Sequence, residues 1–467
     1  MLAPEVPARE GLPCGAAPAR LAGAVFLFLQ GPASPFGHRL ARALTAQGAR
    51  VEKVHLCGGD VMFWPAGSRL SRTRLYRGRF DGWAAYCGRL MDEAGVSDLV
   101  LFGDCRPYHR PAIEAARARG LRLHLLEEGY VRPERITCEP VGVNAYSDLP
   151  RTPDEVLAQA VGLAEPADPA PLPEPFAPRA LWDVRWHLGY FLLAPLFPRY
   201  RRHTLVHPVR DYAGWVWRWL GARGAGRRDR EANARIAQGG PCFLFPLQLE
   251  GDFQMRVHSD FRSVEEVVRA VLGSFAAFAP PDARLVVKRH PYDTSIPGSR
   301  HMVARLAGAF GLGGRVIFIE DGDIEPLVAG SAGVVLVNST TAMLALKHGR
   351  PLKVLGRATY DMEGLSHQGA LDGFWREPRA PDPALAAAYR RLVIARTQLD
   401  GGFFAPQAIA RAVDSLIARM TARLGPDGVV AREAQGGEAH GREAQGGEAQ
   451  GGEAGIGDAN ARQEVPA

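Results

Sequence analysis

Residues 284–291, RLVVKRHP, are the stretch on which the interpretation of the whole chain depends. Their apolar, β-branched half predicts a buried strand, and Pro291 marks where that strand must end, because proline cannot donate to a sheet ladder. In an open α/β sheet, ligands bind at the carboxyl ends of the strands. Lys288, Arg289 and His290 therefore stand where an anionic ligand could be held. A solvated basic strand end is the alternative interpretation.

A second predicted strand ends in two acidic side chains. Glu127 and Glu128 follow the apolar run 121–126, and Gly129 permits a tight turn directly after them. Adjacent carboxylates repel one another, which can raise one pKa toward a value useful for proton transfer. A solvated acidic turn is the competing interpretation.

A third predicted strand, 334–337, runs into Asn338, Ser339 and Thr340 and then into a helix. Ser339 or Thr340 could cap that helix, and the N–H groups of its first turn attract phosphate. Capping alone would also account for the hydroxyl groups. A cap that faces the basic strand end at 288–290 would instead favour a binding role.

The loop FPLQLEGDFQ, residues 245–254, follows the first predicted strand of the second half of the chain. It carries Gln248, Asp252 and Gln254, and a carboxylate in this loop could face a sugar held between two domains. For each of these residues taken singly, an ordinary polar loop is the alternative.

Composition sets the broad class of protein. The 467 residues exceed what one core usually supports, so two domains are expected. The net charge of +6 indicates an anionic partner. The six cysteines are scattered without C-x-x-C spacing, which argues against a disulfide framework or a zinc site and suits a reducing cytosol.

The sequence shows no export signal and no spanning segment. The first 20 residues contain four prolines and lack an apolar core of signal-peptide length. The longest apolar run, 188–197, is about half the ~20 residues that a spanning helix needs. We therefore expect a soluble protein that at most lies against a membrane.

Predicted strands and helices alternate in both halves of the chain, which is typical of parallel sheets with crossover helices. The sequence thus predicts an α/β fold with two Rossmann-like domains in series. No G-x-G-x-x-G follows the first strand, so a standard dinucleotide-binding loop is not expected. The expected boundaries are a flexible leader (1–20), an N-terminal Rossmann-like domain ending in a proline-rich linker (21–178), a helical connector rich in Trp and Arg (179–237), a C-terminal Rossmann-like domain (238–425) and a disordered low-complexity tail (426–467).

The connector has an unusual composition. It holds five of the eight tryptophans, and arginines outnumber acidic residues eleven to three over 179–230. Such a mixture is typical of an element at a membrane interface. A helical hairpin packed between the domains is the alternative.

Several motifs resemble one family. An acidic-acidic-Gly motif, a His-Pro motif and a Ser/Thr pair mark bacterial transferases that use CMP-activated acidic sugars, the sialyltransferases and β-Kdo transferases. The stretches FLQGP (28–32), LFGDCRPYH (101–109) and EEGY (127–130) further resemble capsule polysaccharide biosynthesis and export proteins of the KpsS type. The resemblance covers about residues 22–400 and implies one GT-B-like module with an interdomain cleft.

The resemblance also implies a reaction and a set of site residues. The reaction is transfer of β-Kdo from CMP-β-Kdo to a lysophosphatidylglycerol-type lipid, with retention, which starts the linker that carries the capsule. The first domain would bind the acceptor and the second the CMP-sugar. The implied residues are Glu127 or Glu128 as acid/base, Asp252 as nucleophile, Lys288, His290, Pro291, Asn338, Ser339 and Thr340 for CMP, and Gln30, Asp104, Arg106, Gln248 and Gln254 for the acceptor or other parts of the cleft.

No cofactor or metal is expected beside the donor CMP-Kdo. The one D-x-D, Asp321-Gly322-Asp323, is predicted to lie between a strand and a helix, away from the motifs. The expected partners are the donor, an anionic lysophospholipid at the inner membrane surface and other capsule assembly and export proteins.

Two other functions stay open. A non-catalytic export or assembly factor would bind the glycolipid without releasing CMP from CMP-Kdo. A GT-B-like sugar-nucleotide epimerase would need no lipid acceptor and no Trp/Arg-rich connector. Nucleic-acid binding is disfavoured, because the basic residues gather in one aromatic segment rather than along a polar face.

Overall fold

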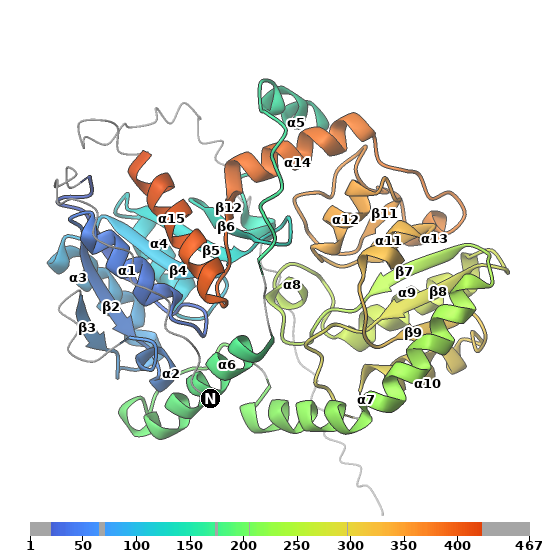
Figure 1. Cartoon of the computed structure of the whole chain (residues 1–467), viewed down its shortest axis with the longest axis horizontal. Helices are drawn as coiled ribbons and strands as arrows, with labels where there is room; N and C mark the ends of the chain where they lie inside the picture. The colour runs from blue at the N-terminus through green and yellow to red at the C-terminus, as the bar shows by residue number, and fades with distance from the viewer. Residues whose placement is uncertain (1–19, 65–70, 173–175, 205, 297, 423–467) are drawn as a thin grey trace, which may run out of the picture.

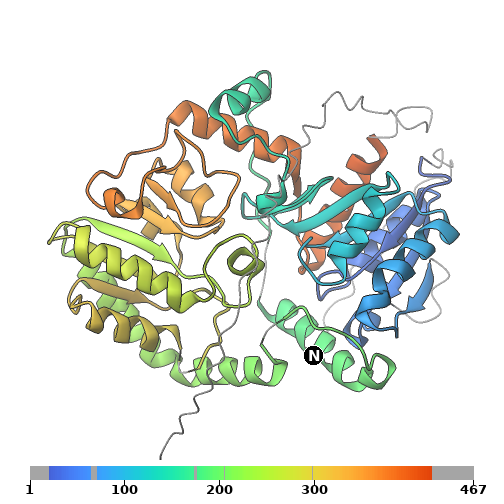
Figure 2. The same ribbon diagram turned by 180° about the vertical axis from the view of Figure 1, so that it is seen from behind.

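The computed structural model describes residues 20–64, 71–172, 176–204, 206–296 and 298–422. They form two lobes, each built on one sheet with helices on both faces, as Figures 1 and 2 show from opposite sides. The predicted flexible leader, except for Arg20, and the predicted disordered tail lie outside the described residues.

The first lobe contains a seven-stranded sheet in the order β12-β6-β5-β4-β1-β2-β3. The strands from β5 to β3 in this order are parallel, whereas β6 is antiparallel to both β5 and β12. The strand bounds are β1 Val25–Phe28, β2 Arg50–His55, β3 Arg72–Leu75, β4 Asp98–Phe102, β5 Arg122–Glu128, β6 Arg135–Glu139 and β12 Gln398–Asp400.

The second lobe contains a parallel five-stranded sheet in the order β11-β10-β7-β8-β9. Its centre is β7, between the strands that carry the two predicted donor motifs. The strand bounds are β7 Cys242–Pro246, β8 Arg284–Lys288, β9 Val316–Ile319, β10 Gly333–Leu336 and β11 Leu352–Val354.

The helices follow the crossover pattern that the sequence predicts. The α-helices are α1 Phe36–Ala46, α2 Gly58–Val61, α3 Trp83–Ala94, α4 His109–Arg117, α5 Pro153–Ala160, α6 Phe176–Leu192, α7 Pro208–Ala237, α8 Phe253–Arg256, α9 Val264–Phe278, α10 Ser299–Ala309, α11 Glu325–Ala329, α12 Thr341–Lys347, α13 Leu371–Phe374, α14 Pro383–Thr397 and α15 Pro406–Ala422. Three short 3-10 turns are η1 Phe80–Gly82, η2 Asn144–Tyr146 and η3 Ala194–Leu196.

The first sheet separates two apolar cores. Side chains alternate along a strand, so Phe26 and Phe28 of β1 pack with α1, whereas Val25 and Leu27 pack with α3 and α4 on the other face. Each core is completed by the apolar stripe of the helices that cover it. The two-lobed α/β architecture is the GT-B-like fold that the sequence predicts.

The last described elements of the chain return to the first lobe. The predicted boundary put residues 238–425 in one C-terminal domain, but α15 packs on α1, and Ile409, Val413 and Leu416 join the core of the first lobe. Strand β12 pairs with β6 of the same sheet. An amphipathic helix shows in sequence which face is buried, but not which lobe it covers.

The proline-rich linker is more structured than predicted. Helix α5 lies within it, capped by Thr152, whose side chain accepts from the N–H of Glu155. Val156 and Ala160 of α5 join the core of the second lobe and pack against α14. The chain therefore passes from the first lobe to the second at α5, before the predicted boundary at residue 178.

The connector forms two helices that serve different lobes. Helix α6 packs on α2, where Gly58 and Gly59 leave room for Gly189 and Trp186, while α7 packs beside β9. The two helices meet where the Nδ1 atom of His187 lies 2.9 Å from the Tyr212 hydroxyl. The connector therefore lies against both lobes. Across the described residues, no helix combines the length and apolarity needed to cross a bilayer.

The packing of α15 predicts a local loss of stability in the first lobe. Leu416 is fully buried, so Leu416→Ala should lower the free energy of unfolding by about 2–5 kcal/mol, with hydrogen exchange accelerated in α1. Gln407→Ala, at an exposed position on the same helix, should change it by less than about 0.5 kcal/mol. Faster exchange confined to the second lobe would contradict this packing.

Candidate active site between the two lobes

A cavity of about 630 Å³ opens between the lobes at the carboxyl ends of β8 and β10. Its wall includes the turn after β5 from the first lobe, part of the linker, and the strand ends of the second lobe. The residues that line it are 131–135, Asp168, Pro169, Pro171, Pro246, Leu247, 288–291, 322–325, 339–341, Met343, Leu344, Lys347 and Arg390. Five predicted donor residues, Lys288, His290, Pro291, Ser339 and Thr340, thus share one cavity.

Most cations around this cavity are already paired. Arg289 contacts Glu320 and Asp321, Arg390 contacts Glu165 and Asp168, and Lys347 lies 2.8 Å from Glu325. Arg135 contacts Asp168 and Asp400.

Two cations differ from the others. Within the described residues, neither Lys288 nor Arg132 forms an ion pair with an acidic side chain. Lys288 is buried and its ammonium reaches only the carbonyl oxygen of Glu320, at 3.4 Å. Burial lowers the pKa of Lys288, because the charged form loses its hydration. An anionic ligand in the cavity would supply the missing partner.

His290 is held in one tautomer. The N–H of Tyr292 donates to its Nδ1 atom at 3.1 Å, so in the neutral ring the proton sits on Nε2. Burial lowers the pKa of His290 to about 4, and the nearby charges of Arg132 and Lys288 act in the same direction. At neutral pH His290 is therefore a neutral donor rather than a cation.

The hydroxyl motif bonds to the start of its helix through Ser339 and not through Thr340. Thr340 occupies the N-cap position of α12 without a side-chain cap bond, whereas the Ser339 hydroxyl accepts from the N–H of Thr341 at 3.2 Å. The backbone of Thr340 is already helical, which keeps its hydroxyl from reaching back to the first turn. Both residues line the cavity, with the Ser339 carbonyl fixed by the Tyr360 hydroxyl.

Asn338, also predicted to bind the donor, follows β10, is buried and is not among the residues that line this cavity. Its side-chain amide donates to the carbonyl of His258 at 2.7 Å, and its N–H donates to Gln248 at 3.1 Å. A Cβ atom at Gly356 would overlap the Asn338 side chain. Gln248 and Asn338 thus join the loop after β7 to the end of β10 and position their neighbours.

Glu127 is the perturbed carboxyl group of the site. It is the next-to-last residue of β5 and lies beside Gly103, whose N–H donates to the carbonyl of Leu126 at 2.8 Å. Burial raises the pKa of Glu127 to about 8, and the negative charges of Asp104 and Asp252 add to the effect. The carboxyl group is therefore protonated at neutral pH and can act as a general acid.

Glu128 differs from its neighbour. Its carboxylate lies 3.8 Å from Arg179 on α6 and is 30% exposed. Neighbouring side chains on a strand point to opposite faces, which accounts for the difference. The environment of Glu127, and not that of Glu128, suits proton transfer.

The loop after β7 brings one further acid to the cleft. Asp252, half-buried just before α8, lies near enough to Glu127 for its charge to raise the pKa of that group. Gln254 falls within α8, and its side chain lies outside the described part of the structure.

The predicted acceptor residues of the first lobe bond to separate partners. Gln30 is 2% exposed and donates to Asp60 at 3.1 Å and to the Tyr200 hydroxyl at 3.2 Å. Arg106 donates to the carbonyl of Gly31 at 3.2 Å. Asp104 accepts from the N–H of Val143 at 3.0 Å. These contacts hold the loops that follow β1 and β4.

Sequence reasoning missed part of the cavity wall. Arg132 lies beyond the acidic motif that was singled out, and no local pattern marks it. The D-x-D segment was expected away from the motifs, yet Gly322 and Asp323 line the cavity. Asp321 there is neutralised by Arg218 and Arg289, and Asp323 accepts from the N–H of Glu325.

Comparison with known proteins places this architecture in a class and then in a family. Residues 97–404 match the family described as capsule polysaccharide biosynthesis protein. The chain is 33% identical over 390 residues to the capsule polysaccharide export protein KpsS of Escherichia coli, covering 82% of this chain and 98% of the relative. It is 35% identical over 383 residues to the capsule polysaccharide modification protein LipB of Neisseria meningitidis, covering 81% and 91%. The chain therefore belongs to the capsule polysaccharide biosynthesis protein family.

Among solved structures, the Thermosulfurimonas dismutans KpsC β-Kdo 2,7 transferase is similar over 85% of this chain and 99% of its own. The identity is 14% and the TM-score 0.38, too low to support a functional argument.

The unpaired state of Lys288 predicts its effect on ligand binding. Lys288→Met should weaken binding of CMP about tenfold or more, because a hydrogen bond to a charged group contributes about 1.5–3 kcal/mol. Lys347→Met, in the same cavity but already paired with Glu325, should change the affinity less than about threefold. Titration calorimetry measures both, and equal losses would show that only the overall charge of the cavity matters.

Proposed function

We propose that the protein is a glycosyltransferase of capsule polysaccharide biosynthesis, which moves β-Kdo from CMP-β-Kdo to an anionic lysophosphatidylglycerol-type lipid with retention. One observation carries the proposal. The cavity at the strand ends is lined by Lys288 and Arg132, for which the described residues show no acidic partner. Glu127, whose pKa burial raises to about 8, lies near the end of β5, outside the residues that line the cavity. Family membership supports the capsule role, and the motifs support the CMP-activated donor.

The donor carries two anionic groups, a phosphate and a sugar carboxylate. Lys288 and the Nε2–H of His290 suit the phosphate, with the hydroxyls of Ser339 and Thr340 beside them. Arg132 reaches the same cavity from the first lobe and suits the carboxylate. The two lobes would then share the donor.

Retention follows from two successive displacements. The Asp252 carboxylate attacks the anomeric carbon, and CMP leaves with the proton of Glu127. The acceptor hydroxyl then attacks the same carbon, releases Asp252 and gives its proton to the Glu127 carboxylate. Each step inverts the configuration, so the product keeps that of the donor.

The experiment is incubation of the full chain with CMP-Kdo and a fluorescent lysophosphatidylglycerol. We expect a β-linked product one Kdo heavier, and with donor alone a Kdo adduct on Asp252 that Asp252→Asn abolishes. An adduct on another residue, or an inverted product, would overturn the mechanism. No CMP release from folded wild-type protein would favour the non-catalytic export factor.

The raised pKa of Glu127 predicts a pH dependence. The protonated form persists up to about pH 8, so kcat/KM for the donor should fall as pH rises through about 8. Glu127→Gln should lower kcat and remove this alkaline limb, whereas Glu128→Gln should keep it. A limb that persists in Glu127→Gln would assign the proton transfer to another group.

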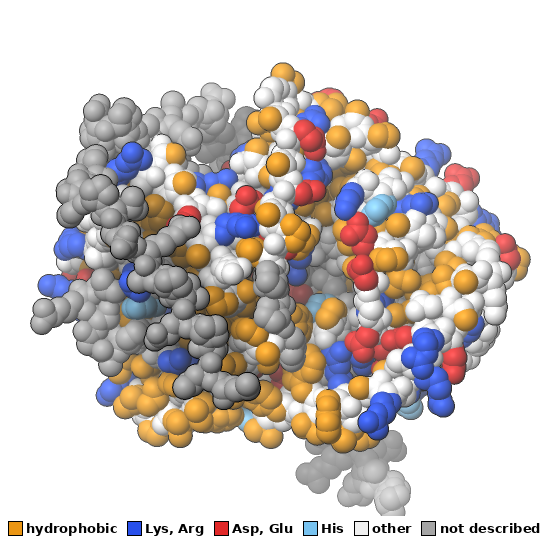
Figure 3. Space-filling view, in the orientation of Figure 1, with side chains coloured by type: hydrophobic (Ala, Val, Ile, Leu, Met, Phe, Trp, Pro, Cys, Tyr) orange, Lys and Arg blue, Asp and Glu red, His pale blue; other side chains and the backbone are white. Residues whose placement is uncertain are grey.

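We further propose that the acceptor is reached from a membrane surface formed by α6 and α7. Figure 3 shows hydrophobic side chains gathered along the lower edge of the molecule, over these two helices. The exposed apolar side chains there are Leu181, Val184, Leu188, Phe191, Leu192, Val209, Val216, Trp217, Trp219 and Leu220. Their spacing forms one stripe on each helix, and Arg199 and Arg210 are exposed beside them.

The arginines contribute less to this surface than the sequence suggests. Arg218 donates to backbone carbonyls of the second lobe, at Pro291 and Asp293. The Arg201 guanidinium stacks 5.0 Å from the Phe80 ring, and Arg202 is half-buried. The apolar stripe is therefore the better target for mutation.

Trp217→Ser with Trp219→Ser should weaken binding to phosphatidylglycerol vesicles at least tenfold, while CMP binding stays unchanged. Tenfold corresponds to ~1.4 kcal/mol, and burial of one large apolar side chain contributes about 1.5–3 kcal/mol. Val161→Ser, which removes an 80% exposed apolar side chain from the linker, is the matched control. Co-sedimentation equal to wild type would place the membrane contact elsewhere.

A further inference from the structure

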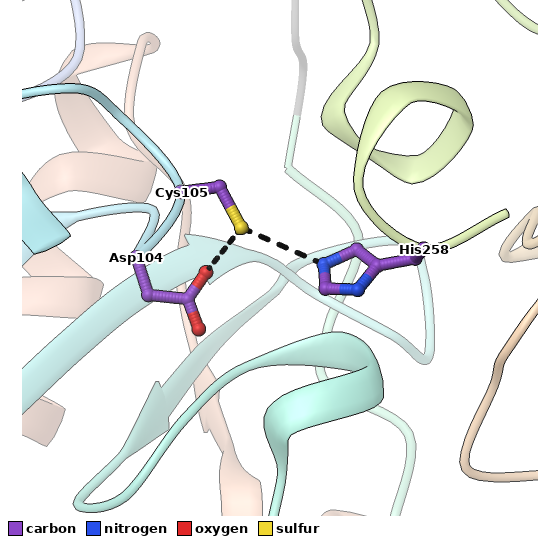
Figure 4. Close-up of side chains that lie close together, drawn as sticks. All are labelled: Asp104, Cys105 and His258. Carbon is purple, nitrogen blue, oxygen red and sulfur yellow. Dashed lines mark hydrogen bonds between the residues drawn. The ribbon is translucent and has the colours of Figure 1, made fainter. Parts of the chain in front are cut away.

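Three side chains with metal-binding atoms converge between the lobes. Asp104 and Cys105 follow β4 of the first lobe, and His258 follows α8 of the second, as Figure 4 shows. All three are buried, and one ligand atom of each lies within 4.8 Å of the other two. The Cys105 sulfur lies 3.7 Å from Nε2 of His258 and 3.1 Å from Oδ1 of Asp104.

These distances approach those of a zinc site. Zinc binds sulfur at about 2.3 Å and nitrogen or oxygen at about 2.0–2.2 Å, so tetrahedral angles put the sulfur about 3.6 Å from the other donors. The sulfur–nitrogen distance matches, and the carboxylate oxygen would move by about half an ångström. A carboxylate, a thiolate and an imidazole together are a ligand set that zinc favours.

The three ligands are also fixed in place by their neighbours. The second oxygen of Asp104 accepts from the N–H of Val143 at 3.0 Å, which leaves Oδ1 aimed at the sulfur. The His258 ring packs edge-on against Tyr146. The His258 carbonyl accepts from Asn338 and from the N–H of Arg357, which anchors the residue to the second lobe. Such outer contacts are what orients metal ligands in proteins.

We propose that Asp104, Cys105 and His258 bind a divalent cation of zinc type, with a fourth position open to water, and that the ion joins the two lobes. Cys105 and His258 are 153 residues apart in the sequence. A search for closely spaced ligands such as C-x-x-C therefore could not find this site. Because both lobes supply ligands, the bound ion would hold them in the arrangement seen here.

The test uses the tag-free full chain, stripped with a chelator and then dialysed against Zn²⁺ or Co²⁺. We expect one bound zinc ion per chain, a thiolate-to-cobalt absorption band and a raised Tm. Cys105→Ser should abolish the band and the rise in Tm, and Asp104→Asn and His258→Gln should weaken binding at least about tenfold. Cys242→Ser, which removes another buried thiol, should behave as wild type.

Circular dichroism establishes that each variant is folded. A wild-type chain that binds no more zinc than Cys105→Ser, or whose cobalt form lacks the thiolate band, would overturn the proposal and leave a hydrogen-bonded contact between the lobes. Neither measurement needs donor or acceptor. Because a cation on Asp104 would lower the pKa of Glu127, the pH profile proposed above is that of the chelator-treated chain.

Discussion

The geometry of the cleft depends on how the chain passes from the second lobe back to the first, and Gln398 is the residue at this passage. It is buried at the end of α14, accepts from the N–H of Tyr130 at 2.9 Å and donates to the Thr137 hydroxyl at 3.0 Å. These bonds hold the turn between Glu128 and Arg132. Gly129 is required there, because a Cβ atom would overlap the carbonyl of Arg135. The turn that presents Arg132 to the second lobe is thus held by Gln398, the first residue of β12, where the chain leaves the second lobe.

Charge is divided between the lobes in a way that suits a doubly anionic substrate. The first lobe contributes carboxyl groups whose mutual repulsion and burial keep Glu127 protonated, and the second contributes Lys288 and the neutral donor His290. Asn338 and Gln30 are buried and hydrogen-bonded to other loops. They fix these loops, because a buried amide with several hydrogen bonds tolerates little displacement.

Much of this arrangement could be predicted from the sequence, and the failures have physical causes. The strand 284–288 and its basic end were predictable, because a β-branched run and a proline are local signals. Strand β3 was not, since its side chains are largely exposed and show no apolar pattern. The burial of Asn338 and Gln30 could not be predicted, because burial of a polar side chain depends on distant partners. The position of α15 and of the D-x-D segment depends on tertiary packing in the same way.

The packing of α15 on α1 has a consequence for the order of folding. The apolar face of α1, with Phe36, Leu40 and Leu44, is covered by residues near the end of the described chain. At synthesis rates of about 5–20 residues per second, this face stays uncovered for on the order of tens of seconds, until α15 has been synthesised. During that time the second lobe can fold completely while the first stays unfinished. The lobe that is made first is therefore the lobe that is completed last, and it is the one exposed to chaperones and to aggregation during synthesis.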